Sequence, residues 1–191
     1  MIYDVLNFLK LRLESFLSEK RSSKEPLITL SNPWSNNDDN KNSSYLNSMS
    51  LINIEEEKTF ISQGHKIVQG KNGKYYKKEP DLKVNLYVLI SAYNKNYEDA
   101  LKFISKVVGF YQQNNVFQKD RNNLQNDDFP VNVEKLIIEL YTADFDQQSQ
   151  IWGSLNTGYL PSVIYKVRML IIDTDKADQE VSLIKEIKAG Y

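Results

Sequence analysis

The sequence contains no cysteine and only one histidine, His65. The lack of cysteine excludes disulfides and thiolate metal sites. A single histidine without an acidic partner nearby in the sequence is a poor basis for a catalytic zinc site or for general acid–base chemistry. We therefore expect His65 to be a structural or surface residue, and we expect neither a metal ion nor a cofactor.

The sequence also lacks an excess of either charge and any long apolar run. It has 24 lysine and arginine residues against 25 aspartate and glutamate residues, a formal net charge of -1. Proteins that bind nucleic acids usually carry a basic excess. No apolar run approaches the ~20 residues that a membrane helix needs, and the first ten residues do not resemble a signal peptide. We expect no nucleic-acid or membrane partner, assembly in the cytoplasm, and any release without a classical signal.

Motifs that would indicate catalysis are missing or weak. The segment from Gly70 to Gly73 lacks the Gly-Lys-Ser/Thr ending of a phosphate-binding loop. Asp173 and Asp175 lack the other ligand positions of a calcium loop. The densest acidic run, Glu55–Glu57, is interpreted as a solvated strand edge, because catalytic carboxylate pairs usually converge from separate segments of a cleft. The sequence thus predicts no catalytic residues.

What the chain does contain is the composition of a soluble globular domain, with 191 residues, of which 41% are hydrophobic and 26% charged. Apolar residues recur at three- and four-residue steps from Ile2 to about Glu19 and from Tyr97 to Gln113, which predicts two amphipathic helices. A shorter helix is predicted from Phe145 to Leu155, with Asp144 as its N-cap.

Apolar alternation and turn residues predict the strands. The pair Asn72-Gly73 indicates a hairpin, and the tail after Asp173 is expected to form a final short helix. The predicted strands are Leu27–Leu30, Ser48–Glu57, Thr59–Gln69, Leu82–Ala92, Val133–Tyr141 and Ser162–Ile172.

This order of elements predicts the fold class. We expect one α+β domain over residues 1–191, with a mostly antiparallel sheet and helices packed on one face. Strands near Met49, Val84, Leu136 and Val167 should lie in one sheet. The Asn- and Ser-rich stretch near residues 35–44 favours turns and is expected to be an exposed loop.

Segments spread from Met1 to about Ile172 follow the pattern of a known family. They are Met1–Leu9, Met49–Glu57, Asn85–Ala92 with Tyr97–Ile104, Glu139–Tyr141 with Gln150–Leu155, and Tyr159–Arg168. In this order they resemble the N-terminal domain of the tail-terminator (cap) proteins of extracellular contractile injection systems. The Asn-rich loop departs from the family pattern, and the larger C-terminal module of some relatives has no counterpart in the chain.

The resemblance implies a structural assembly protein without enzymatic activity. Such a protein forms a homohexameric ring that ends the inner tube and the contractile sheath of a phage-tail-like particle. Its partners would be other copies of itself and the sheath and tube proteins, within a particle that is released from the cell. Two alternatives stay open: a generic dimeric adaptor, with one isologous interface, and an unrecognised small-ligand enzyme, with a cleft of converging carboxylates.

A ring contact that closes on itself needs two different, complementary patches on each subunit. The candidates are an acidic strand edge and a basic hairpin, namely Glu55, Glu56 and Glu57 on one side and Lys71, Lys74, Lys77 and Lys78 on the other. Trp152 is a further interface candidate with two interpretations. It is either an anchor of the helix in the core or a hot spot of an interface.

Overall fold

The computed structural model describes residues 1–18, 27–33, 45–57, 66–69, 74–78, 83–94, 96–119, 128–131, 133–171 and 179–180. In chain order the elements are α1 (Ile2–Ser18), β1 (Thr29–Leu30), β2 (Tyr45–Glu56), β3 (Lys66–Gln69), β4 (Tyr75–Lys78), β5 (Lys83–Asn94), α2 (Tyr97–Gln113), β6 (Val116–Gln118), β7 (Val133–Tyr141), α3 (Phe145–Ser154), β8 (Ser162–Ile171) and β9 (Gln179–Glu180). The predicted exposed loop near residues 35–44 lies outside the described residues.

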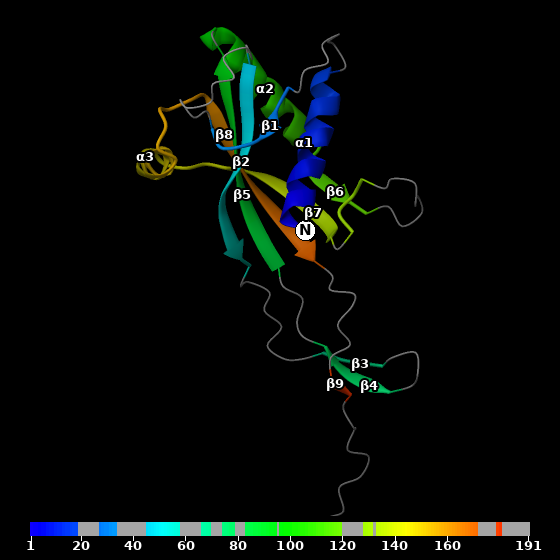
Figure 1. Cartoon of the computed structure of the whole chain (residues 1–191). Coiled ribbons are helices and arrows are strands. Elements are labelled where there is room, and N and C mark those ends of the chain that lie inside the picture. Colours follow the sequence, from blue (N-terminus) through cyan, green and yellow to red (C-terminus); the bar gives the residue numbers. More distant parts are fainter. Residues whose placement is uncertain are drawn as a thin grey trace, which may run out of the picture.

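Six strands form the main sheet, in the order β1-β2-β5-β8-β7-β6 (Figure 1). Neighbouring strands are antiparallel, except that β1 and β2 are parallel. The strands that contain Met49, Val84, Leu136 and Val167 therefore lie in one sheet, as the sequence predicts. The α+β class and the mostly antiparallel sheet are confirmed.

The long helices α1 and α2 lie on the same face of the main sheet (Figure 1). Four-residue steps in α1 direct Leu9 and Leu13 toward the sheet, where they join Val107 of α2 and Leu86 and Val167 of the strands in one apolar core. Each of these five side chains is at most 1% exposed. Burying an aliphatic side chain of this size stabilises the fold by about 1.5–3 kcal/mol, so this face holds most of the apolar stabilisation.

The short helix α3 packs against the opposite face of the sheet. Its Trp152 contacts a second, smaller cluster that contains Leu89 of β5 and Ile164 of β8. These two residues are direct cross-strand partners, and alternation along β5 places them on the face away from α1 and α2. Asp144 caps α3 in a capping box with Gln147, which confirms the predicted N-cap.

A separate three-stranded sheet, in the order β3-β4-β9, lies beyond the end of the main sheet where β2 ends and β5 begins (Figure 1). The antiparallel pairing of β3 with β4 confirms the predicted hairpin. The helix expected after Asp173 is corrected at Gln179 and Glu180, which are extended because their backbone pairs with β4. The rest of that predicted helix lies outside the described residues.

Side-chain burial corrects the predicted faces in several places. The apolar stripe of α2 includes Tyr97 and Leu101 in the sequence, but these are 62% and 44% exposed, whereas Phe110 is buried. In β7 the sequence alternates Leu136, Ile138 and Leu140 as one apolar face, but Leu140 is 59% exposed. Both faces of β2 carry apolar residues in the sequence, which predicts burial on both sides, but this holds only in its first half, because residues 53–56 are exposed.

The strand β6 lies in a mostly polar stretch, residues 112–128, for which the sequence pattern predicts no strand. Phe117 lies opposite Leu136 of β7 and its ring meets the ring of Phe8 edge-on, with centroids 5.4 Å apart. Phe8 and Phe117 are more than 100 residues apart in the sequence, so local patterning could not reveal their contact.

Candidate functional site

The described residues hold no cluster of side chains that could bind a metal ion. No group of three or more potential ligand side chains occurs among them, and none of the described helices is long and apolar enough to cross a membrane. Small hollows of about 180 to 420 Å³ occur on the surface. The features that stand out are instead surfaces: one face of the main sheet, the two edges of that sheet, and the α3 corner.

The face of the main sheet on which α3 packs also carries a network of charged and polar side chains. Tyr87 of β5 donates a hydrogen bond of 2.7 Å to the Oε2 atom of Glu55. The Nζ atom of Lys166 lies 3.5 Å from the same oxygen and 5.5 Å from the centre of the Tyr87 ring. Glu55, Tyr87 and Lys166 thus hold one another in place on three neighbouring strands.

This network shifts the pKa of each member. The hydrogen bond from Tyr87, followed by the positive charge of Lys166, lowers the pKa of Glu55 below its ordinary value. The same hydrogen bond, followed by burial, raises the pKa of Tyr87. Burial disfavours the charged form of Lys166, but its interactions with Tyr87 and Glu55 outweigh burial and raise its pKa. At neutral pH the carboxylate and the ammonium group are therefore both charged.

A second set of interactions continues the network toward the end of the sheet where β2 ends and β5 begins. The Nε atom of Arg168 lies 3.2 Å from the Oε2 atom of Glu139, and Asn85 donates a hydrogen bond of 3.0 Å to Glu57. A hollow of about 270 Å³ lies beside these side chains, with Ile137 in its lining. Exposed ion pairs of this kind contribute little to stability, but they fix the positions of charges that a partner surface would meet.

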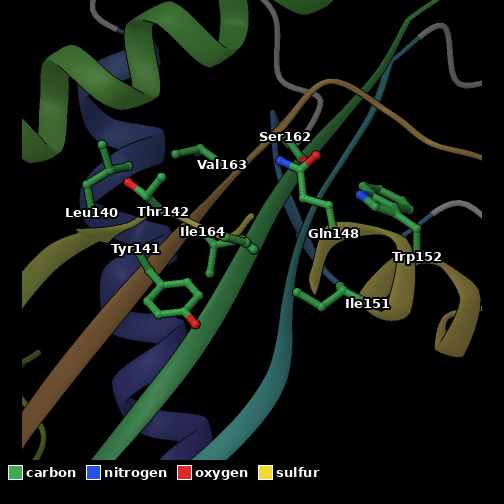
Figure 2. Close-up of a pocket in the computed structure, with 10 residues that line it drawn as sticks. Leu140, Tyr141, Thr142, Gln148, Ile151, Trp152, Ser162, Val163 and Ile164 are labelled. Carbon is green, nitrogen blue, oxygen red and sulfur yellow. The ribbon is translucent and has the colours of Figure 1, made fainter. Parts of the chain in front are cut away.

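At the α3 corner, apolar and polar side chains surround a hollow of about 180 Å³ (Figure 2). Trp152 is 7% exposed, and its ring meets that of Tyr159 at a centroid distance of 5.6 Å. Phe145, at the start of the same helix, is 89% exposed. The burial of Trp152 is what the core-anchor interpretation expects, whereas the exposed aromatic residues of this corner were not singled out from the sequence.

The acidic and basic residues that the sequence predicts as complementary patches lie on different sheets. Glu55 and Glu56 are exposed at the end of β2, and Glu57 follows directly, half-buried. Lys74 is exposed just before β4, while Lys77 and Lys78 belong to that strand. Lys71 lies outside the described residues. The two predicted patches thus lie on separate elements of one subunit.

Comparisons with known proteins give one family and related structures. The model of the family described as the Pvc16 N-terminal domain matches residues 4–186, and no curated protein matches the chain. The fold is similar to that of the sheath/tube terminator of an extracellular contractile injection system, PVC, in the extended state, with a TM-score of 0.63, 16% identity, and coverage of 100% of this chain and 64% of that chain.

It is also similar to the tube-terminating cap of the anti-feeding prophage, with a TM-score of 0.64, 17% identity, and coverage of 100% of this chain and 62% of that chain. At these identities the likeness concerns the fold. The chain spans less than two thirds of the length of either protein.

Proposed function

Since the chain belongs to the Pvc16 N-terminal domain family, we propose that it caps the end of the inner tube and contractile sheath of a phage-tail-like contractile injection system. The family membership, which extends over residues 4–186, is the observation that carries the proposal. In this role the protein acts as a ring of identical subunits, a homohexamer, within a particle that is assembled in the cytoplasm and then released.

The structural relatives support this role. One is a sheath/tube terminator and the other a tube-terminating cap, and the whole of this chain follows their fold. Because the chain spans only part of the length of these proteins, binding to both sheath and tube is part of the proposal.

The surfaces of the subunit fit a protein that works by contact and without turnover of a substrate. A cap must bind the last ring of a growing tube and offer no equivalent site for the next ring. This requires broad surfaces with fixed charges, such as the network of Glu55, Tyr87 and Lys166 on the sheet face. Electrostatic matching of this kind contributes more to orientation and specificity than to affinity.

The candidate patches have separate places in this proposal. The acidic edge Glu55–Glu57 lies at the side of the main sheet, where it is available for a neighbouring subunit. Lys77 and Lys78 belong to β4 of the small sheet, which extends beyond the end of the main sheet, and Lys74 directly precedes that strand (Figure 1). In this proposal the hairpin supplies a second contact. Two different contact surfaces are what a closed, heterologous ring needs.

The test is deletion of the protein from a strain that makes the particle, followed by electron microscopy of the purified particles. We expect tubes and sheaths of irregular length with frayed ends opposite the baseplate, and complementation by the wild-type chain should restore uniform ends. Particles of normal length, stability and end structure in the deletion strain would contradict the proposal.

A further inference from the structure

The strand β2 is open along much of its outer side. It pairs with β5 over its length, with one bulge between Leu51 and Asn53, but on its other side β1 reaches only Ser48 and Met49. From Leu51 to Glu56 no described strand pairs with the outer edge. An exposed row of backbone groups is a template for an added strand, and natural proteins usually protect such edges.

The backbone bonds show which groups of β2 point outward. The N–H of Glu57 donates to the carbonyl of Lys83 over 2.9 Å, and in an antiparallel pair such bonds occur at every second residue. The backbone groups of Glu55 therefore point toward β5, and those of Ile54 and Glu56 point away from the sheet. The N–H of Ile54 bonds to the side-chain oxygen of Asn53 at 2.9 Å, a local contact that an incoming strand would replace.

Ile54 is unusual for a free strand edge because its apolar side chain is 50% exposed. Charged residues, prolines and bulges are the common means of protecting an edge against association. Here Glu56 adds an exposed charge, and this charge would select the partner strand by favouring a basic one.

The opposite edge of the same sheet is also open. The N–H of Ile138 donates to the carbonyl of Asn115 over 2.8 Å, and the N–H of Lys119 donates to the carbonyl of Glu134 over 3.1 Å. Alternation then directs the backbone groups of Val116 and Gln118 away from β7. Within the described part of the chain, β6 is the last strand on this side.

The two edges match in cross-strand register, in strand direction and in charge. Cross-strand register places Glu56 of β2 and Phe117 of β6 in one row across the sheet. The alternating strand directions make β2 and β6 run the same way. Glu56 is exposed on one edge, and the exposed Lys119 follows β6 on the other. A second copy set beside the first would therefore bring an acidic edge against a basic one.

We propose that residues 53–56 of one subunit, which follow a bulge between Leu51 and Asn53, form an intermolecular strand pair with residues 116–118 of the next subunit. The occupant of the open β2 edge is thus a second copy of this chain, and Glu56 meets Lys119 across the contact. This inference rests on the proposed ring and specifies its subunit contact. Because the two edges differ, the contact is heterologous and continues from copy to copy until the ring closes, and added strands derive their affinity mainly from backbone hydrogen bonds.

Charge reversal tests the pair. Sedimentation of the purified full-length chain over a concentration series at low salt should show self-association. Glu56→Lys and Lys119→Glu should each weaken it about tenfold, since like charges then face each other. The double variant Glu56→Lys/Lys119→Glu should restore it, because every contact uses one residue of each kind. Lys106→Glu, a reversal on the exposed side of α2, is the control and should change nothing.

Engineered cysteines test the geometry, because the chain has none of its own. Cross-strand register also places the exposed Glu55 and Val116 in one row across the sheet, so their side chains point to the same face. A chain with Glu55→Cys and Val116→Cys should give a ladder of covalent oligomers on mild oxidation. Either single variant alone should give no covalent oligomers, and a mixture of the two should give covalent dimers only. Ile54→Pro removes an outward N–H and no β2–β5 hydrogen bond, so it should abolish association without lowering the melting temperature by more than its control, Ile54→Ala, does.

Several results would overturn this contact. They are a wild-type chain that stays monomeric at every concentration, covalent dimers from Glu55→Cys alone, or failure of the double charge reversal to restore association. Rescue of Glu56→Lys by Lys74→Glu would assign the acidic edge to the basic hairpin instead. If the deletion strain shows defective particle ends while these contact tests fail, the cap function stands and only this subunit contact is wrong.

Discussion

Replacing Trp152 by alanine separates the two interpretations of this residue, because α3 carries a buried and an exposed aromatic side chain. Trp152 is 7% exposed, whereas Phe145, on the same helix, is 89% exposed. Trp152→Ala therefore removes packing against Leu89 and Ile164, while Phe145→Ala removes a side chain that lies almost entirely in water. The two substitutions form a matched pair on one helix.

The expected magnitude follows from the buried area. A buried tryptophan removes roughly 200 Å² from water, which corresponds to about 5 kcal/mol at about 25 cal/mol per Å². Residual structure in the unfolded chain reduces this value, so a loss of about 3–5 kcal/mol is expected for Trp152→Ala, in the usual range for tryptophan truncation. Phe145→Ala should change the free energy of unfolding by about 0.5 kcal/mol or less.

The assay is urea unfolding, followed by circular dichroism and by the fluorescence of Trp34, which remains in the variant. Sedimentation of both variants measures self-association alongside stability. Normal stability of Trp152→Ala combined with lost association would refute the core-anchor interpretation and make Trp152 an interface hot spot. Normal stability of Phe145→Ala with lost association would assign the interface role to the exposed face of α3.

Two further predictions concern polar pairs. The hydroxyls of Ser48 and Ser91 lie 2.7 Å apart in the buried sheet, so Ser48→Ala should cost roughly 1–3 kcal/mol by leaving its partner unsatisfied, and the double alanine variant should be closer to wild type in chemical unfolding. Additive losses would contradict this. Because the pKa of Glu55 is lowered below 4.5 in the fold, its contribution to stability is present above that pH and is lost as the pH falls through the folded-state pKa. Thermal melts of Glu55→Gln should therefore show a smaller decrease in stability below pH 4.5 than wild-type melts, and identical acid profiles would refute the assignment.

The helices and most strands could be predicted from the sequence because their signals are local. The apolar steps in α1 and α2 and the capping residues Asp144 and Gln147 act within one or two helical turns. The long strands β5, β7 and β8 were found because apolar residues dominate at least one of their faces. The family pattern was likewise visible in short segments, and the match over residues 4–186 confirms it.

The candidate surfaces were only partly visible in the sequence. The acidic run Glu55–Glu57 was identified as a strand edge from its composition, and the exposure of Glu55 and Glu56 agrees with this. Its bonding partners Tyr87 and Lys166 were not identified, because they come from strands that are separated by up to 111 positions and meet only through the order of the sheet. The exposure of Phe145 was equally hidden, since an apolar residue at the start of a helix is usually read as part of its buried side.

The sequence by itself determined the α+β class, the positions of the main helices and strands, and the family, because each depends on residues close together in the chain. Only the tertiary structure decided that α3 packs on the face opposite α1 and α2, that β6 forms one edge of the sheet, and that half of β2 is open at the other edge. These features depend on which strands become neighbours. Strand order is set by the long-range burial of apolar faces, and no local pattern records it.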